Sequence, residues 1–109
     1  MATVQNIVID QGTTFSLDIN LTNDDASAKD LTNYTVASQM RKSYEASTAT
    51  SFTCVKVDNT GKVTISLTAT QTATLKPGRY VYDVEIASAS ETLRVLEGLV
   101  TVTPEVTKV

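Results

Sequence analysis

Carboxylate and amide side chains gather in one predicted loop of this sequence, at Asn23, Asp24, Asp25 and Asp30. Oxygen ligands of this kind are the ones that Ca²⁺ prefers in proteins. Their spacing, however, lacks the D-x-[DN]-x-[DN]-G pattern of a calcium-binding loop. We therefore expect a solvated turn at this loop, and we expect neither a metal site nor a cofactor in the chain.

Histidine is absent from the 109 residues, so the commonest general base and the commonest metal ligand are both missing. No glycine-rich phosphate-binding loop is present. The single cysteine, Cys54, lies in a strand-like segment without a neighbouring histidine, which indicates a small buried thiol rather than a nucleophile. The sequence therefore predicts no catalytic residue and a protein that is not an enzyme.

The charges are scattered along the chain. Nine basic and 12 acidic residues give a net charge of -3, and no run of Lys or Arg could follow a phosphate backbone. Nucleic acid is therefore not an expected partner. Arg41 and Lys42, at the end of a predicted strand, could contact a partner, but such exposed basic residues are more often simply solvated.

The segment MATVQNIVIDQG has no early basic residue and only a short apolar stretch, which does not fit a secretory signal. No apolar run approaches the ~18 residues of a membrane span. We therefore expect a protein made and folded in a cytosol, without a membrane partner. A single cysteine cannot form an internal disulfide, so packing and backbone hydrogen bonds must hold the fold.

Strand-like segments recur along the whole chain and must position these side chains. They cover residues 3–9, 15–21, 34–40, 51–57, 63–69, 79–86 and 92–103. In FSLDINL, residues 15–21, apolar and polar side chains alternate, as in a sheet with one buried face. Gln11-Gly12 and the turn around Gly61 allow the chain to reverse direction. Seven strands in one domain, residues 1–109, predict an all-β antiparallel sandwich.

Two tyrosines mark the connection between the fifth and sixth strands. The segment ATQTATLKPG, residues 69–78, predicts a short helical turn that ends at Pro77 and Gly78. Tyr80 and Tyr82 follow on one face of the sixth strand, and a tyrosine that bonds back to the preceding corner is typical of immunoglobulin-like sandwiches. We predict that one of the two fixes this crossover, and that Gly98 marks a bulge in the last strand.

Four segments, in the order QGTTFSLDINL, DLTNYTVASQMRKSYEASTATSF, PGRYVYDVEI and RVLEGLVTVTPEVT, carry a family resemblance. The chain resembles small virion structural proteins of tailed phages, notably those that infect marine cyanobacteria. It is similar, more distantly, to the immunoglobulin-like N-terminal domain of phage baseplate upper proteins. In that domain an acidic residue, a leucine and a small polar residue precede the third strand, as Asp30-Leu31-Thr32 does here. The resemblance covers nearly the whole chain. It implies a particle component and does not imply a catalytic residue.

The resemblance leads us to expect a non-enzymatic virion structural protein made in the host cytoplasm, first of all a capsid decoration or cement protein. Its partners would be other virion subunits, namely the major capsid protein or tail and neck proteins, and further copies of itself in a homo-oligomer. A neck, tail or baseplate component is the alternative within this class. A carbohydrate-binding module is the alternative from another class, although only 6% of residues are aromatic and Tyr44 is the sole aromatic in a predicted loop.

Overall fold

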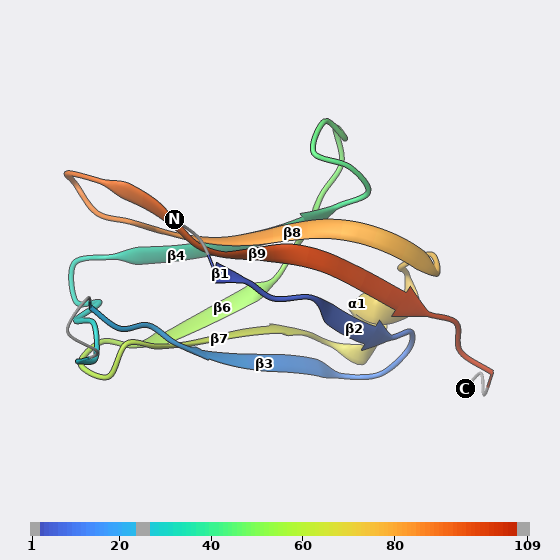
Figure 1. The fold of residues 1–109 in the computed structure, drawn as a ribbon. Coiled ribbons are helices and arrows are strands. Elements are labelled where there is room, and N and C mark those ends of the chain that lie inside the picture. Colours follow the sequence, from blue (N-terminus) through green and yellow to red (C-terminus); the bar gives the residue numbers. More distant parts are fainter. Residues whose placement is uncertain (1–2, 24–26, 107–109) are drawn as a thin grey trace.

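A computed structural model describes residues 3–23 and 27–106, in which two β-sheets pack face to face (Figure 1). Sheet A contains β1 (Thr3–Val4), β2 (Ile7–Asp10), β4 (Thr35–Arg41), β5 (Thr50–Ser51), β8 (Gly78–Ala87) and β9 (Thr92–Thr103). Sheet B contains β3 (Phe15–Asn20), β6 (Thr53–Val57) and β7 (Lys62–Leu67). The helix α1 (Ala69–Ala73) joins β7 to β8. The predicted all-β sandwich with a short helical turn is confirmed.

The strand order shows where the first predicted strand belongs. Sheet A runs β1-β9-β8-β4-β5, with β2 also beside β9, and sheet B runs β3-β7-β6. Most neighbours are antiparallel, as expected, but β1 and β2 run parallel to β9. The chain then crosses from sheet A to sheet B between β2 and β3. In sheet B, β3 lies at one edge.

Two of the predicted strands are divided in the structure. Residues 3–9 form β1 and β2, which are separated at Gln5 and Asn6. Residues 51–57 are interrupted at Phe52, because the chain passes there from sheet A to sheet B. The backbone N–H of Phe52 donates to the carbonyl of Ser38, and the Phe52 ring is buried in the core. The crossing is therefore anchored at both the backbone and the side chain.

The core consists of the inward rows that the alternation predicts. On β7 and β8 these rows are completely or almost completely buried, namely Val63, Ile65, Leu67, Tyr82, Val84 and Ile86. On β3 the inward side chains pack against this core but are only half-buried. The core is therefore well covered at β7 and β8 and less well covered along the β3 edge.

The bulge that was expected at Gly98 lies elsewhere. Gly98 pairs regularly with Tyr82, and the β8–β9 register shifts after Val84, which leaves Val95 as the extra residue. A Cβ added at Gly98 would lie 2.2 Å from the carbonyl oxygen of Gln5. The prediction of a bulge at Gly98 is wrong, because this glycine is needed for the close approach of the first strand instead.

The crossover from sheet B to sheet A has the structure that the sequence predicts. Thr68 and Gln71 form a capping box at the start of α1, in which each side chain bonds the backbone of the other. The hydroxyl of half-buried Tyr80 donates to the carbonyl of Lys76 at 2.8 Å. The predicted tyrosine corner is thus confirmed at Tyr80. Within the described residues, no helix is long and apolar enough to cross a membrane.

Candidate functional site

A groove of about 450 Å³ lies on the outer face of sheet A. Outward-facing side chains of β4, β8 and β9 form its floor, and the loop between β4 and β5 rises beside it, at the top of Figure 1. Side chains alternate between the two faces of a strand, so the pattern that builds the core also brings these outward residues together. The groove is the candidate binding site of the described chain.

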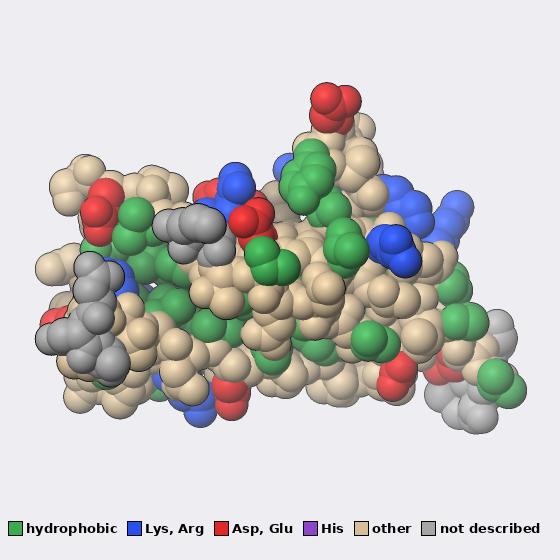
Figure 2. Space-filling view, in the orientation of Figure 1, with side chains coloured by type: hydrophobic (Ala, Val, Ile, Leu, Met, Phe, Trp, Pro, Cys, Tyr) green, Lys and Arg blue, Asp and Glu red, His purple; other side chains and the backbone are tan. Residues whose placement is uncertain are grey.

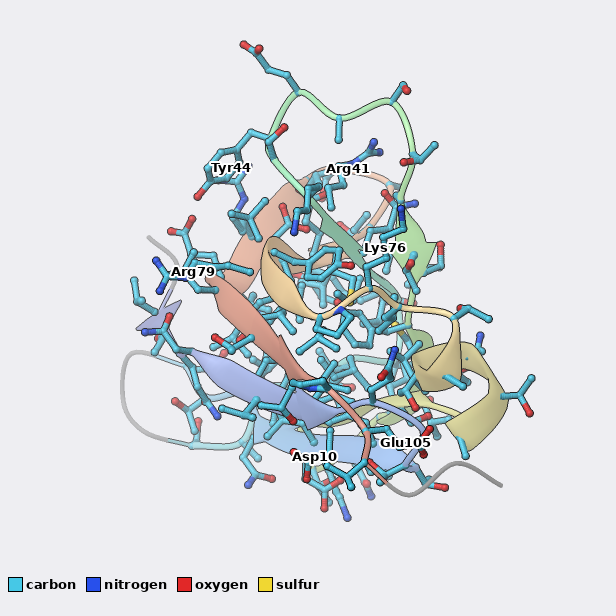
Figure 3. The ribbon with its side chains drawn as sticks, turned by 90° about the vertical axis from the view of Figure 1, so that its right-hand side faces the viewer. Asp10, Arg41, Tyr44, Lys76, Arg79 and Glu105 are labelled. Carbon is cyan, nitrogen blue, oxygen red and sulfur yellow. The ribbon has the colours of Figure 1, made fainter. Side chains whose placement is uncertain are left out.

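Tyr44 forms the aromatic wall of this groove. It lies in the loop between β4 and β5, and 79% of its surface is exposed. In Figure 3 its ring projects from the loop on the side of the sheet where Arg79 lies. An aromatic ring this exposed is available for contact with a partner.

Arg41 holds the loop that carries Tyr44. It is half-buried at the end of β4, and its Nη1 donates to the carbonyl of Ala46 at 2.6 Å. Its Nη2 donates to Oε1 of Gln39 at 3.1 Å. The interpretation of Arg41 as a simply solvated residue is therefore wrong, because its guanidinium spans the base of the loop.

The outer face of sheet A, which includes the floor of the groove, changes from apolar to charged along the strands. Val81 on β8 lies opposite Leu99 on β9, and both face outward. Val8 on β2 extends the apolar part toward the edge of the sheet, and 62% of it is exposed. Figure 2 shows apolar side chains on the loop and on the face below it. Tyr44 therefore overhangs a floor that is apolar in part.

Arg94 lies among three carboxylates at the other end of the groove. Its Nε is 3.4 Å from a carboxylate oxygen of Asp83 and 4.0 Å from one of Glu85, and its Nη1 is 3.7 Å from one of Glu97. These side chains are partly exposed, so each ion pair contributes less than about 1 kcal/mol. The cluster offers both donors and acceptors of hydrogen bonds to a polar ligand.

Four basic residues lie at the end of sheet A next to the groove. Figure 3 shows Arg41, Lys76 and Arg79 there, and Lys42 follows Arg41 in the chain. The Lys42 ammonium lies 4.7 Å from the centre of the Tyr80 ring, whose hydroxyl bonds the Lys76 backbone. Within residues 3–23 and 27–106, none of the four forms an ion pair with an acidic side chain. The part of this end that lies next to the groove is therefore basic, whereas the acidic residues Asp10 and Glu105 lie at the same end of the molecule, lower in Figure 3.

The acidic loop of the sequence analysis lies away from this groove, and Asp24 and Asp25 fall outside the described residues. The Asn23 side chain bonds within the loop. Hydrogen bonds from the side chain and backbone of Thr32 lower the pKa of the Asp30 carboxyl. In the part of the chain that the structure describes, no cluster of three potential ligands could hold a metal ion.

Cys54 lies on the other sheet, in β6, where its side chain packs against the core and is half-buried. Burial raises the pKa of its thiol, which disfavours the reactive thiolate. The thiol is therefore a poor nucleophile.

The sequence indicated some members of the groove and missed others. Tyr44 and Arg41 were visible as an aromatic residue in a loop and a basic residue at a strand end. Asp83 and Glu85 lie on the face of β8 opposite to Tyr80 and Tyr82, as alternation along the sixth predicted strand requires. Arg94 and its carboxylates form a cluster only because the extra residue in β9 sets the register with β8.

Comparison with known proteins bears on the fold. No protein-family model and no curated protein matches the chain. The solved structure of InlP from Listeria monocytogenes matches with a TM-score of 0.52 and 14% identity, over 94% of this chain and 28% of that chain. A family 123 glycoside hydrolase from Clostridium perfringens, whose structure concerns glycolipid glycan hydrolysis, matches with a TM-score of 0.44 and 13% identity, over 96% of this chain and 24% of that chain. The chain spans less than a third of either protein, and the likeness to InlP shows a shared fold alone.

Proposed function

We propose that this protein is a non-enzymatic structural protein of a tailed-phage virion, and that it acts as a capsid decoration or cement protein. The resemblance to small virion proteins supports this proposal. The immunoglobulin-like sandwich fits it, because such a domain offers faces, edges and loops for contact with larger subunits.

The observation that carries the proposal is the exposed ring of Tyr44 above the groove on sheet A. Tyrosine and arginine are enriched among the residues that dominate protein–protein binding energy, and such residues lie within well-packed apolar surroundings. Here Tyr44 and Arg41 line the groove together with the apolar residue Val81. The neighbouring basic cluster would complement an acidic surface on a capsid subunit. We therefore assign the attachment surface to this groove.

Localisation on purified particles tests the proposal directly. Gold-labelled antibodies against the protein should decorate the capsids of intact virions in many copies. Label confined to the neck, tail or baseplate would support the alternative within the same class. Intact particles that contain none of the protein would refute a virion role.

A pair of matched variants tests the groove itself. Tyr44→Ala should bind more weakly than the wild type to phage particles from which this protein is missing, because the exposed ring is lost. Val55→Ala is the control, since Val55 is a 58% exposed apolar residue on β6 of the opposite sheet. Equal binding by both variants would remove the groove as the attachment surface.

Carbohydrate binding is the second candidate, and the same exposed ring favours it. Sugar rings stack on aromatic side chains, and the groove places Gln39, Asp83 and Arg94 within one site with Tyr44. Calorimetry with oligosaccharides from a glycan-array screen distinguishes the two functions. If the protein binds a sugar, and if Tyr44→Ala abolishes this binding while Tyr44→Phe preserves it, the function as a carbohydrate-binding module would be favoured over the virion role.

A further inference from the structure

Three of the four sheet edges carry features that hinder pairing with another chain. On sheet A, β5 has only two residues, and the opposite edge is interrupted between β1 and β2. On β6, Lys56 lies in the same row as half-buried Cys54, and its ammonium donates to the carbonyl of Leu31 at 3.0 Å. Short strands, interruptions and charged side chains of this kind protect edges from association.

The fourth edge, β3, has none of these features. Its six residues contain no proline, no glycine and no inward charge. Its inward side chains Phe15, Leu17 and Ile19 are only half-buried. Their partners on β7 are at most 1% exposed, namely Leu67, Ile65 and Val63. The inward row of β3 therefore lacks cover on its outer flank.

The backbone of β3 also has unused hydrogen-bonding groups. The N–H of Leu21 donates to the carbonyl of Gly61 at 2.8 Å, in line with the β3–β7 register. Because bonding direction alternates along an antiparallel strand, the N–H and C=O groups of Ser16, Asp18 and Asn20 point away from β7. Outside the β3–β7 ladder, these backbone groups form no hydrogen bond with any described residue. They form a free row of donors and acceptors.

The sandwich is open on the same side. A hollow of about 810 Å³ lies at the end of β3, between the two sheets. Leu21 after β3 and Leu93 and Val95 of β9 are its apolar lining residues. The rest of the lining is polar or charged, namely Thr3, Asn20, Thr22, Asn23, Lys29, Glu91 and Arg94. Figure 2 shows apolar side chains in this hollow, at the left of the view. A free strand edge with an open space beside it can accept another strand, whose main chain then bonds to the edge.

We propose that β3 pairs antiparallel with β3 of a second copy of this chain, so that the two B sheets join into one continuous sheet. The pairing is isologous, because the same edge contributes from both copies. It would cover the half-buried inward row and satisfy the free backbone groups. This inference concerns self-association and does not depend on the proposed virion role.

Charge excludes one register of this pairing, and contact between the apolar rows favours another. A register centred on Asp18 would place two carboxylates directly opposite each other, which is unfavourable. A register centred on Leu17 places Asp18 opposite Ser16 of the second copy. It also places Phe15 opposite Ile19 and Leu17 opposite its own equivalent. The three half-buried apolar residues of each copy then lie against those of the other.

Analytical ultracentrifugation of the intact chain tests the dimer. The protein should sediment as a dimer, and Ser16→Pro should shift it to a monomer. Proline removes the N–H that faces the second copy, whereas the bonds from β3 to β7 are kept. The matched control Ser16→Ala keeps this N–H and should remain a dimer.

A cysteine cross-link tests the register and does not require the proline variant to fold. In a Cys54→Ser background, Leu17→Cys should give a disulfide-linked dimer on mild oxidation. Opposite residues of a non-hydrogen-bonded pair have Cα atoms about 4.5 Å apart, within disulfide range. Val55→Cys in the same background, on the protected β6 edge, should cross-link much less. A chain that sediments as a monomer at all concentrations, or a dimer in which Leu17→Cys cross-links no more than Val55→Cys, would overturn the proposal.

Discussion

The hydroxyl of Tyr82 donates a hydrogen bond of 2.6 Å to the carbonyl oxygen of Gln5, which lies 77 residues earlier in the chain. Gln5 occupies the break between β1 and β2, and its own N–H donates to the carbonyl of Glu97 at 2.8 Å. The bond from Tyr82 therefore joins β8 to the first segment of the chain across β9. Because Ile7 and Ile9 of that segment are buried in the core, it belongs to the folded domain.

Replacement of Tyr82 by Phe should lower the free energy of unfolding by about 1–2 kcal/mol, because it leaves the Gln5 carbonyl without this partner. Urea denaturation followed by circular dichroism measures the change. Tyr44→Phe is the control and should match the wild type, since Tyr44 is exposed and its hydroxyl forms no hydrogen bond with the described residues. Equal denaturation midpoints for all three proteins would contradict the assigned role of Tyr82.

Alkaline pH should destabilise the protein through the same residue. Burial raises the pKa of Tyr82 to about 12 from an ordinary value of 10.0. Between these two values the unfolded chain releases the phenolic proton while the folded chain keeps it. The free energy of unfolding should therefore fall with rising pH in this window, by at most about 1.4 kcal/mol per pH unit. Below pH 10 both states keep the proton, so the full stabilisation by Tyr82 is present there.

The control for this pH dependence is Tyr82→Phe, which removes the titrating group. Its free energy of unfolding should fall less steeply in the same window. Parallel slopes for the variant and the wild type would show that another group controls alkaline unfolding.

Tyr80→Phe should cost about 1 kcal/mol, because it removes the bond to the Lys76 carbonyl. The loss should be smaller than that of Tyr82→Phe, since Tyr80 is only half-buried and water can reach its partner more easily. Thermal and urea unfolding of the two variants side by side measures this order. A larger loss for Tyr80→Phe would reverse the relative importance of the two tyrosines.

The strands of this protein could be predicted because alternation is a local signal. Residues 92–103 were expected to form one strand, and β9 has these bounds. The parallel pairing of β2 with β9 could not be predicted, since it depends on contacts such as Ile7 with Val100 that no short segment encodes. The role of Gly98 was missed for the same reason, because its neighbour Gln5 comes from the other end of the chain.

The candidate site was only partly predictable. Tyr44 could be recognised from its place in a polar loop, because an aromatic residue there has little chance of burial. Arg94 could not be assigned to the groove, since its distance to Asp83 depends on the extra residue at Val95. The open edge at β3 was also hidden, because the FSLDINL pattern is the same for an edge strand and a central strand.

Gly98→Ala should destabilise the protein by about 1–3 kcal/mol, as is typical when a methyl group is forced into a packed site. The added carbon would meet the Gln5 carbonyl at 2.2 Å, and a backbone atom cannot rotate away. Hydrogen exchange should accelerate most in residues 3–10. Thr101→Ala, an exposed position on the same strand, is the control and should leave exchange there unchanged. Unchanged exchange in Gly98→Ala would show that the first strand does not depend on this contact.

Arg41→Ala should loosen the loop that carries Tyr44 while the sheets stay intact. The guanidinium bonds the Ala46 carbonyl at 2.6 Å, so its loss frees the base of the loop at a cost of about 1 kcal/mol. Hydrogen exchange and limited proteolysis should both accelerate in residues 43–49. The matched control is Lys42→Ala, because the Lys42 ammonium lies over the Tyr80 ring and not on the loop.

The same change separates anchoring of the loop from direct contact with a partner. If Arg41 acts by holding Tyr44 in place, Arg41→Lys should restore part of the protection, since an ammonium can still donate one hydrogen bond to the Ala46 carbonyl. Partner binding through Tyr44 should then increase in the order Arg41→Ala, Arg41→Lys and wild type, in parallel with protection of the loop from exchange. The reason is that an ordered ring loses less conformational entropy on binding. Binding that falls in Arg41→Ala without any change in loop exchange would show instead that Arg41 touches the partner itself.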